Sequence, residues 1–494
     1  MERYIYLILL PLGGAFIIAA LNASIKNTAL RNTISDILSN LITLALAAVA
    51  VTSFGINGSY SIGGWPIVPI PLGITLVADG FTVLMLAVVN IIAFCATLYS
   101  INYMNQYTSK RHYYSLFLLM LAGMNGALLS GDFFNLFVFI EIASISSYAL
   151  VGFGTEAEEL EASFKYMVMG GIASTFILLA IAILYSKFGV LNMAHISQAI
   201  AASGQSPLLK FSLFLFIIAF SIKAAIIPFH AWLPDAHPAA PAPVSAMLSG
   251  VLIKTLGIYT MTRVIMNVFA ADISMLAPLG IISIMAGVLL ALGQTDMKRL
   301  FAYHSVSQIG YIILGIGLGT PLGIMGGLFH LINHSIFKSL LFLNSGAVAY
   351  RLGTRDLNEM GGLNKVMPVT GATSFIASLS IAGIPPFNGF FSKLIIILAC
   401  VQAGHTGFAL WAVAGSILTL SSFMKVQKLA FFGKIAEKHK NVKEAPFMMS
   451  ASVVILAVLC IAASFIMLPQ IKNKVLQPAV DALLAGPEYG KIIQ

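Results

Sequence analysis

Long apolar runs, each about long enough to cross a lipid bilayer, follow one another along almost the whole chain. A membrane-spanning helix needs about 20 apolar residues, and only 9% of the 494 residues are charged, against about 25% in a soluble domain. The sequence therefore predicts an all-α polytopic membrane protein with about fourteen transmembrane helices. These are expected over residues 3–21, 32–54, 79–100, 113–130, 132–152, 164–186, 208–228, 241–266, 273–293, 301–319, 322–349, 370–402, 407–430 and 446–469.

Basic residues are distributed unevenly between the connections that join these runs. Counting the adjoining span ends, sixteen Lys and Arg residues belong to the odd-numbered connections, and seven belong to the even-numbered connections and the two termini. Because Lys and Arg collect on the cytoplasmic side, the asymmetry predicts a cell-membrane protein with both termini on the non-cytoplasmic side. A miscounted span would scramble the alternation, so the asymmetry also supports the number of spans. It accounts for the net charge of +9 without a nucleic-acid partner.

A short repeat links the two halves of the chain. "AAIIPFHAW" at 224–232 resembles "AGIPPFNGF" at 382–390, with an offset of 158 residues. Pro228 in the first copy and Pro385 and Pro386 in the second predict helix breaks, because proline removes a backbone hydrogen bond. Freed backbone groups inside a membrane must face protein or water. Paired proline-interrupted spans of this kind indicate an ion site in transporter folds.

Ionisable side chains within the apolar runs are functional candidates, because burying a charge in a membrane is costly. Glu141 and Lys223 would form a pair whose proton affinities depend on their separation, since burial disfavours each charge and the partner restores it. Separating them would make the lysine release its proton. A static buried ion pair and a permanently protonated carboxyl are the alternatives. Lys254 lies too deep in its span to reach the interface, and Lys393 follows the second proline break.

Three further candidates share one helical face. His330, His334 and Lys338 follow one another at intervals of four residues, which aligns them along a helix. Histidine titrates near neutral pH and can relay protons. Structural hydrogen bonding is the main alternative, and a metal site lacks the HExxH pattern or a third ligand.

Four residues near span ends have a less defined role. His304 lies near the cytoplasmic end of its span and is a proton-relay candidate or a polar interface residue. His230, Asp235 and His237 lie in a cytoplasmic connection, where they line an entrance or only cap and turn the chain. The three cysteines are far apart in apolar runs, without metal or disulfide spacing. No CxxC or glycine-rich nucleotide loop is present, so the sequence predicts no metal, no cofactor and no catalytic site on this chain.

At these residues the chain resembles the antiporter-like subunits shared by Mrp-type Na⁺/H⁺ antiporters, respiratory complex I and membrane-bound hydrogenases. The resemblance covers roughly residues 125–395. Its segments are "NLFVFIEIASISSYALVGF", "EASFKYMVMGGIAS", "SIKAAIIPFHAWLPDAHPAAPAPVSAMLSGVLIKTLGIY", "DMKRLFAYHSVSQIGYI", "FHLINHSIFKSLLFLNSGAV" and "GIPPFNGFFSKLIII".

The resemblance implies two inverted five-helix repeats with broken helices 7 and 12. It divides the chain into helices 1–3 (1–112), a first repeat (113–268), a second repeat (269–430), and helix 14 with a short tail (431–494). Glu141 and Lys223 would belong to the first half-channel, and Lys254 would connect it to the central polar axis. That axis would contain His330, His334 and Lys338, and Lys393 would end the second half-channel.

Two positions bear on the kind of complex and on the route of the proton. Some complex I members have Glu where this chain has Lys393, and Lys at this position fits the D-type member of the Mrp complex as well as several hydrogenase and complex I members. Gln308 stands where some members have His, which leaves the proton entrance open between this position and His304.

The function expected from residues and resemblance together is proton translocation within a multisubunit membrane complex. The D-type component of an Mrp-type cation/proton antiporter is the first candidate. The same module in a redox-driven hydrogenase or complex I relative is the second, and there the enzyme chemistry would belong to other subunits. A stand-alone solute transporter is the third. The expected partners are other membrane subunits, and Na⁺ would pass elsewhere in the complex.

Overall fold

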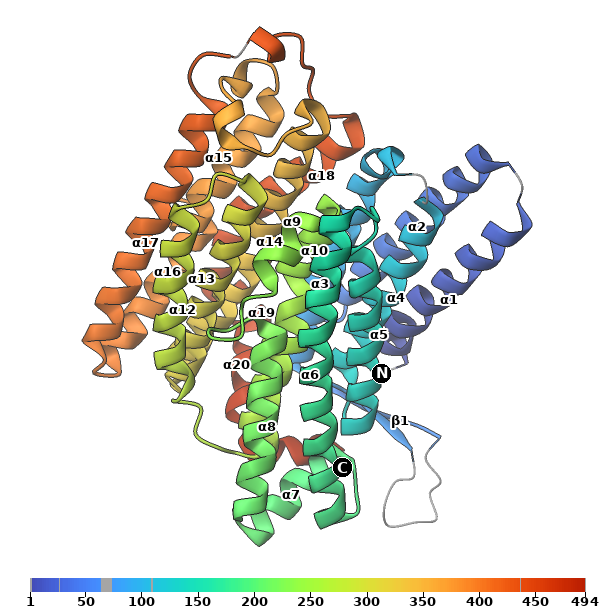
Figure 1. Cartoon of the computed structure of the whole chain (residues 1–494). Helices are drawn as coiled ribbons and strands as arrows, with labels where there is room; N and C mark the ends of the chain where they lie inside the picture. The colour runs from blue at the N-terminus through green and yellow to red at the C-terminus, as the bar shows by residue number, and fades with distance from the viewer. Residues whose placement is uncertain (1, 26, 64–72, 108–109, 436, 494) are drawn as a thin grey trace.

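The chain folds into a bundle of long helices that run roughly alongside one another (Figure 1). This computed structural model of the whole chain describes residues 2–25, 27–63, 73–107, 110–435 and 437–493; Lys26, a basic residue of the first predicted connection, lies outside them. Within the described ranges, eleven helical segments are long and apolar enough to cross a membrane. Three shorter helices, Leu276–Leu292, Pro368–Ala382 and Asn388–Gln402, are also apolar. The mostly helical membrane fold is confirmed, while the number of about fourteen spans stays a prediction.

The first long helices are apolar segments that begin at polar capping residues. Asn27, Asp79 and Asp132 accept hydrogen bonds from backbone N–H groups at the starts of α2, α3 and α5, which satisfies donors that the helix leaves free. The elements of this part are α1 (Arg3–Ser24), α2 (Thr28–Val51), α3 (Gly80–Tyr103), η1 (Met104–Gln106), α4 (Lys110–Leu129), α5 (Phe133–Val151) and α6 (Ala157–Phe188).

A two-stranded antiparallel hairpin precedes α3. Strand β1 (Gly58–Ile62) pairs with β2 (Ile74–Ala78), with Gly58 opposite Ala78. The hairpin lies within the connection between the predicted spans 32–54 and 79–100, so it displaces no predicted helix and the class stays mostly helical.

The middle of the chain contains the first interrupted helix and an irregular one. The elements are α7 (Met193–Ser203), α8 (Pro207–Ala224), α9 (Leu233–Ala239), α10 (Ala242–Met247), η2 (Leu248–Leu252), η3 (Lys254–Tyr259), α11 (Thr260–Thr262) and η4 (Arg263–Val268). Residues 242–268 form one continuous helical segment, in which η2, η3 and η4 have π-helical hydrogen bonding. Such wide turns are often found at functional sites.

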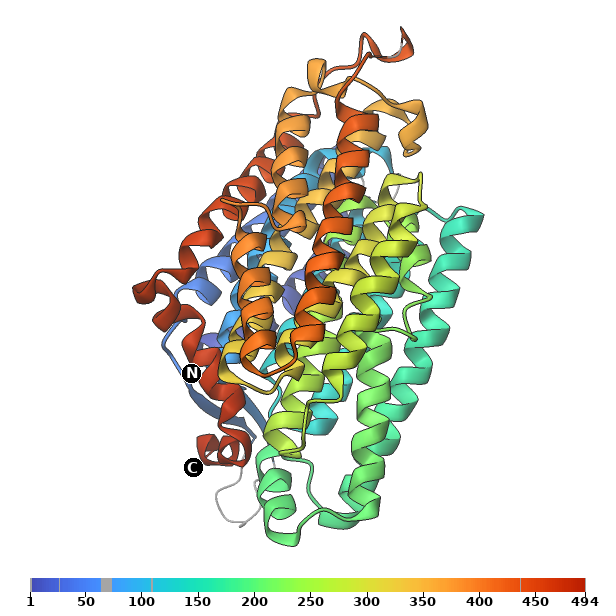
Figure 2. The same ribbon diagram turned by 90° about the vertical axis from the view of Figure 1, so that its left-hand side faces the viewer.

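The remaining helices complete the bundle and return the chain to the end where it began. They are α12 (Leu276–Leu292), α13 (Met297–Gly317), α14 (Pro321–Leu352), η5 (Leu357–Glu359), η6 (Leu363–Lys365), α15 (Pro368–Ala382), α16 (Asn388–Gln402), α17 (Thr406–Val426), η7 (Gln427–Phe431), η8 (Glu437–His439), α18 (Phe447–Ala462), η9 (Ala463–Met467), α19 (Pro469–Val475), α20 (Gln477–Leu484) and η10 (Gly486–Ile493). In both views the termini lie in the lower half with α7, and the segment joining α17 to α18 forms the upper end (Figures 1 and 2).

The two helix interruptions have the same backbone geometry. Ala225 and Gly383, which are 158 residues apart, end α8 and α15 with left-handed φ angles of 55° and 80°. The next residue donates its N–H back to the fifth preceding carbonyl in both copies, from Ile226 to Ser221 and from Ile384 to Leu379, at 3.0 Å each. Pro228 lies between α8 and α9, and Pro385 and Pro386 lie between α15 and α16. The sequence repeat therefore corresponds to a local structural repeat.

Helix α14 lies at the centre of the bundle. Every residue from Gly323 to Val348 is buried, and the helix packs against α13, α15, α16, α18 and the α10–η2 segment. A helix buried all round in a membrane protein has no face for lipid. The polar side chains of α14 are therefore surrounded by protein, and they face the proline-broken helices.

Candidate functional site

The first group of candidate residues joins α5, α6 and α8. The Lys223 Nζ lies 4.0 Å from the Glu141 Oε1, and it donates hydrogen bonds to the Ser144 Oγ at 2.9 Å and to the Tyr148 OH at 3.5 Å. Glu141, Ser144 and Tyr148 lie three and four residues apart on α5, so one face of this helix supplies all three groups. The structure thus brings the predicted carboxylate and lysine together.

Ser174 of α6 lies between the two charges. Its hydroxyl donates to the Glu141 carboxylate and accepts from the Lys223 Nζ at 3.3 Å. The Lys223 side chain is only 3% exposed, while the Glu141 side chain is 27% exposed. The carboxylate therefore faces the outer surface of the bundle, and the ammonium faces its interior. A hydroxyl between them can accept and donate at once, so the pair is joined through a third group.

The second group surrounds Lys254, which is fully buried. Its Nζ donates to the backbone carbonyl oxygens of Ser249 at 2.6 Å and Gly250 at 2.5 Å. These carbonyls belong to the π-helical segment η2, where the regular hydrogen-bond ladder of an α-helix is interrupted. Close packing of Gly257 against Ala224 joins this segment to the end of α8. The ammonium is therefore held by backbone dipoles of its own helix.

Three groups on α14 lie next to this segment, as their spacing predicts. Gly250 packs against the Ser339 side chain, which places η2 beside the α14 turns that carry His334 and Lys338. Lys338 donates to the Phe301 carbonyl, and its Nζ lies 5.6 Å from the centre of the Phe342 ring. Aromatic faces stabilise a desolvated ammonium. Neither ring nitrogen of His334 has a hydrogen-bond partner among the described residues.

His330 connects the central helix to the second broken helix. Its Nδ1 lies 2.9 Å from the Ser392 Oγ and its Nε2 lies 3.2 Å from the Gln308 Oε1. The rings of His330 and His334 are nearly parallel, with centres 6.4 Å apart. Among the described residues, no three His, Cys, Asp or Glu side chains cluster closely enough to hold a metal ion.

Lys393 ends the row of buried groups. Its Nζ donates to the Ile381 carbonyl at 2.8 Å and the Ser416 Oγ at 3.2 Å, and it lies 4.6 Å from the centre of the Tyr311 ring. Tyr311 in turn contacts the His330 ring, with centres 5.4 Å apart. Lys393 also lines a groove of about 230 Å³. Ile381 occupies the position in the second copy of the repeat that Lys223 occupies in the first. The Lys393 ammonium, which contacts Ile381, therefore lies beside the same point of its helix break as Lys223 does, although Lys393 follows its break in the sequence and Lys223 precedes its own.

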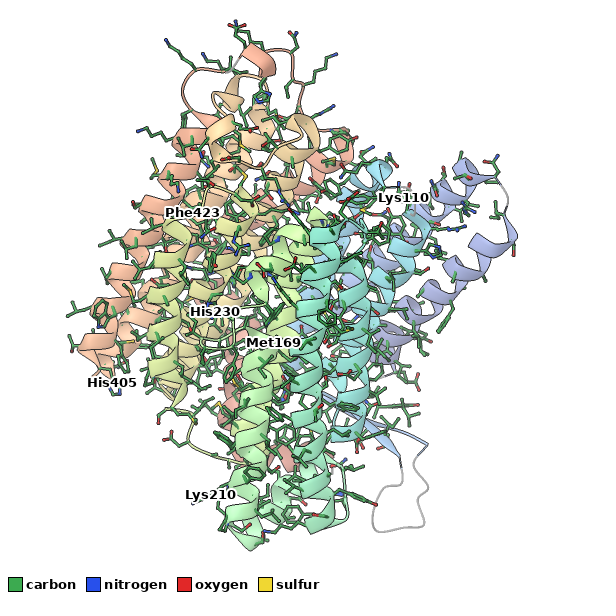
Figure 3. All side chains as sticks on the ribbon, in the orientation of Figure 1. Lys110, Met169, Lys210, His230, His405 and Phe423 are labelled. Atoms are coloured by element: carbon green, nitrogen blue, oxygen red, sulfur yellow. The ribbon has the colours of Figure 1, made fainter. Side chains whose placement is uncertain are left out.

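The other candidates lie in different surroundings from those the sequence indicates. His304 is fully buried, and its Nε2 lies 2.8 Å from the Ser422 Oγ, so it is not an interface residue. His230 lies near mid-height of the bundle (Figure 3) rather than in an end connection. His237 is fully buried without a hydrogen-bond partner for its ring among the described residues. His230 and His237 lie inside the bundle because the helix break after α8 folds the residues that follow it back between the other helices.

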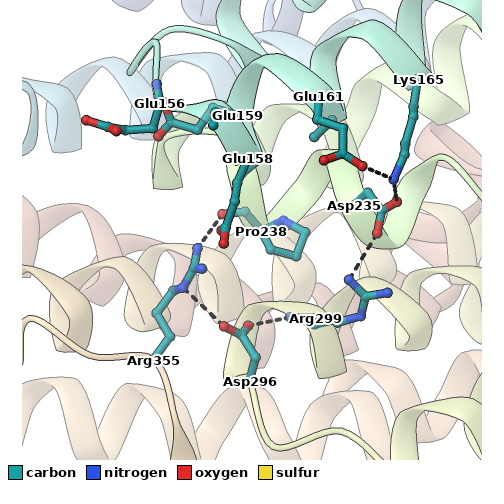
Figure 4. A pocket seen from close by; sticks show the side chains of 13 residues that line it. Glu156, Glu158, Glu159, Glu161, Lys165, Asp235, Pro238, Asp296, Arg299 and Arg355 are labelled. Atoms are coloured by element: carbon teal, nitrogen blue, oxygen red, sulfur yellow. Dashed lines mark hydrogen bonds and ion pairs between the residues drawn. The ribbon is translucent and has the colours of Figure 1, made fainter.

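Asp235 lies in a charged cavity of about 680 Å³ (Figure 4). Its carboxylate pairs with Lys165 at 3.1 Å and with Arg299 at 3.0 Å, and a second pair in the same cavity joins Arg355 to Asp296 at 3.1 Å. These ion pairs connect three helices and the segment that follows α14. Asp235 therefore lies at a water-accessible mouth, away from the buried row.

A buried ion pair outside the row has no counterpart in the sequence reasoning. The sequence pattern places Arg263 near the end of its span and counts it with the adjoining connection, whereas the structure buries it against Asp79. The Arg263 Nη1 lies 2.7 Å from the Asp79 Oδ2, and Nη2 donates to Oδ1 at 2.8 Å. The Tyr489 ring, with its centre 5.0 Å from the guanidinium, covers the other side. The partners are 184 residues apart, so no local spacing reveals the pair.

The fold and the site together define a class: polytopic helical membrane proteins built around a row of buried ionisable side chains and two broken helices. Residues 130–419 match the family described as NADH:quinone oxidoreductase/Mrp antiporter, TM. Residues 66–114 match the N-terminus of chain 5 of NADH-ubiquinone oxidoreductase (complex I). The first match covers more than half of the chain. The chain belongs to the NADH:quinone oxidoreductase/Mrp antiporter transmembrane family.

Similar proteins agree with this assignment along the whole chain. The D-type component of the Na(+)/H(+) antiporter of Alkalihalophilus pseudofirmus is 34% identical over 489 residues, which cover 96% of this chain and 98% of that protein. A chain of the Mrp complex from Dietzia sp. DQ12-45-1b is 28% identical with a TM-score of 0.89. A chain of the membrane-bound sulfane sulfur reductase, an archaeal respiratory membrane complex, is 30% identical with the same TM-score. Both structural matches cover 100% of each chain.

Proposed function

We propose that this chain translocates protons as an antiporter-like subunit of a multisubunit membrane complex, in the manner of the D-type component of an Na⁺/H⁺ antiporter. The observation that carries the proposal is the row of buried lysines and histidines through the middle of the bundle, from Lys223 to Lys393. Four lysines in this row are nearly inaccessible, and among the described residues only Lys223 has a carboxylate partner. Such costly groups are retained in a membrane where they move charge.

The arrangement at Glu141 supports a switch between two charge states. While the carboxylate stays 4.0 Å from the Lys223 Nζ, the opposite charges stabilise each other. If Glu141 moves away on the surface of the bundle, Lys223 is left buried with only hydroxyl partners. A buried ammonium without a counter-charge then releases its proton to the next group.

The proposed route follows the order of the buried groups through the bundle. A proton from Lys223 passes to Lys254 beside the α8 break, and then to His334 and Lys338 on α14. Contacts through His330 and Tyr311 lead on to Lys393. His334 supports the relay step because its ring nitrogens have no fixed partner among the described side chains. An imidazole with a free nitrogen can accept a proton on one side and release it on the other.

The arrangement in the membrane follows from the same observations. We place both termini on the non-cytoplasmic side, because the basic segment between α17 and α18 forms the opposite end of the bundle (Figure 3). We propose that residues 113–268 and 269–430 are inverted five-helix repeats, flanked by 1–112 and 431–494. The matched backbone at Ala225 and Gly383 supports the repeat.

Glu141→Ala tests the proposed function. We expect proton-coupled exchange to fall by about 10²-fold, the scale of losing a positioned proton-transfer group, because Lys223 then has no counter-charge to cycle against. The measurement is dye-monitored proton movement in vesicles that contain the assembled complex. Glu158→Ala, an exposed carboxylate at the charged mouth, is the matched control and should retain wild-type exchange. Wild-type exchange in Glu141→Ala would refute the role of the pair.

A redox-driven parent complex is the second candidate, favoured by the equal structural similarity to the sulfane sulfur reductase chain. The composition of the native complex separates the two. We expect purification through a tag on this chain to recover only membrane subunits, because the similarity to the D-type antiporter component covers nearly the full length of both proteins. Co-purification of iron–sulfur or [NiFe] subunits would assign the chain to a redox-driven complex instead.

A further inference from the structure

Lysines concentrate at one end of the molecule, in the segment that joins α17 to α18. Residues 425–447, named here the basic loop, contain six lysines and two glutamates. The segment begins in the last turn of α17 and ends at the first residue of α18. Side chains that end in nitrogen project from it at the upper end of the bundle (Figure 3).

Among the described side chains of the basic loop, most lysines have no carboxylate partner. The Glu444 carboxylate accepts hydrogen bonds from the Val369 N–H at 2.7 Å and the Thr370 hydroxyl at 2.6 Å, so it caps α15 instead of pairing with a lysine. Glu437 pairs with Lys440. The exposed side chains of Lys428, Lys434 and Lys443 have no ion-pair partner among the described residues. They are therefore available to an anionic group outside the chain.

The basic loop is attached to the bundle at several points. The Gly362 N–H donates to the Phe432 carbonyl at 3.0 Å, and the His439 Nε2 lies 3.2 Å from the Glu359 carbonyl. The Arg351 Nε donates to the Glu444 carbonyl at 3.0 Å. These contacts attach the start, the middle and the end of the loop to the bundle. An array of cations on an attached loop loses less entropy on binding than one on a free tail.

Two exposed aromatic rings lie where the loop leaves and rejoins the bundle. Phe432 follows the last residue of η7 and is 46% exposed, and Phe447 begins α18 and is 77% exposed. Aromatic rings and basic side chains together are typical of the level where lipid headgroups meet the acyl chains. An acidic protein surface would match the lysines but would leave these two rings without a role. The combination therefore favours lipid.

We infer that the basic loop binds anionic phospholipid headgroups, with Phe432 and Phe447 in the boundary between headgroups and acyl chains. The inference is independent of the proposed transport function, because the loop contains no residue of the buried row. Juxtamembrane clusters of four to eight basic residues bind anionic lipid by this electrostatic mechanism. The bound lipid would stabilise the loop against α15 and the end of α14, which it contacts.

A fluorescent reporter in the loop tests this inference. Phe447→Trp, in the full chain within its complex, is reconstituted in nanodiscs containing either brominated phosphatidylglycerol or brominated phosphatidylcholine. Subtracting the signal of the protein without this substitution isolates the reporter. We expect several-fold stronger quenching by the anionic lipid at equal mole fraction, since each lysine near an anionic surface contributes about fivefold. High salt should reduce this preference.

Variants separate charge from other causes. Lys428→Gln/Lys434→Gln/Lys443→Gln should abolish the preference for phosphatidylglycerol, and the same three Lys→Arg substitutions should retain it. The matched control, Lys210→Gln/Lys472→Gln/Lys474→Gln, removes three lysines from the opposite end and should leave the preference unchanged. Equal quenching by both lipids in the reporter protein would overturn the inference. So would an unchanged preference in the Gln variant, or loss of a protein subunit from that variant without any change in lipid preference.

Discussion

Lys223→Ala is expected to abolish proton-coupled exchange while the complex still assembles. The ammonium is the only buried cation of the row that lies within ion-pair distance of a carboxylate among the described residues. Its loss removes both the proton carrier and the partner of Glu141. Positioned proton-transfer groups typically contribute about 10² to 10⁴-fold to a rate, so we expect a loss on this scale. Dye-monitored proton movement in vesicles, normalised to the amount of assembled complex, measures it.

Two further variants separate proton transfer from structure. Lys223→Arg keeps a cation beside Glu141, but a guanidinium does not release its proton at physiological pH, so this variant should assemble normally and still fail to exchange. Lys210→Ala removes a lysine from the exposed start of the same helix and should exchange at the wild-type rate. Normal exchange in Lys223→Arg would show that the group acts only as a fixed charge.

Asp79→Ala is expected to have the largest effect on stability. The carboxylate is buried and paired with Arg263 through two close contacts, and its removal leaves an uncompensated guanidinium in the interior. Breaking a buried ion pair by removing one partner costs about 3–5 kcal/mol. The expected result is a clearly lower midpoint of thermal unfolding for the purified complex. A smaller amount of this chain should also be recovered in the complex.

The reason for this effect can be checked with two comparisons. Asp79→Leu/Arg263→Leu removes both charges and should recover much of the lost stability, because no charge is then left buried alone. Asp296→Ala, like Asp79→Ala, removes a helix N-cap, but the pair that it breaks has side chains about one-third exposed. Such exposed pairs contribute at most about 1 kcal/mol. Equal destabilisation by Asp79→Ala and Asp296→Ala would contradict the argument from burial.

The candidate site shows how far sequence reasoning extends. The depth of Glu141, Lys223 and Lys254 within apolar runs identifies them without a structure, because a charge within a membrane span is rare and costly. The regular spacing of His330 and Lys338 predicts their common face in the same way. Both signals are local in the sequence, and helix geometry is regular enough to convert them into positions.

The groups that complete the site give no such signal. Ser174 joins Glu141 to Lys223, yet serine is common in apolar helices and its spacing shows no pattern. Gln308 becomes important only because it lies beside His330. Lys393 follows its helix break, whereas Lys223 precedes its own, and only the folded backbone shows that both ammonium groups reach equivalent points of the two breaks.

By itself, the sequence determined the membrane class, the approximate positions of the helices, the two proline breaks and the ionisable candidates that lie deep within apolar runs. These features depend on hydrophobic length, helical periodicity and the chemistry of proline, which act within a few turns of chain. Only the tertiary structure decided which buried groups are partners. It joined Asp79 to Arg263 across 184 residues, and it placed His237, expected in a connection, in the interior. The physical reason is that pairing depends on which helices pack together, and packing is set by side-chain shape over the whole bundle rather than by neighbours in the chain.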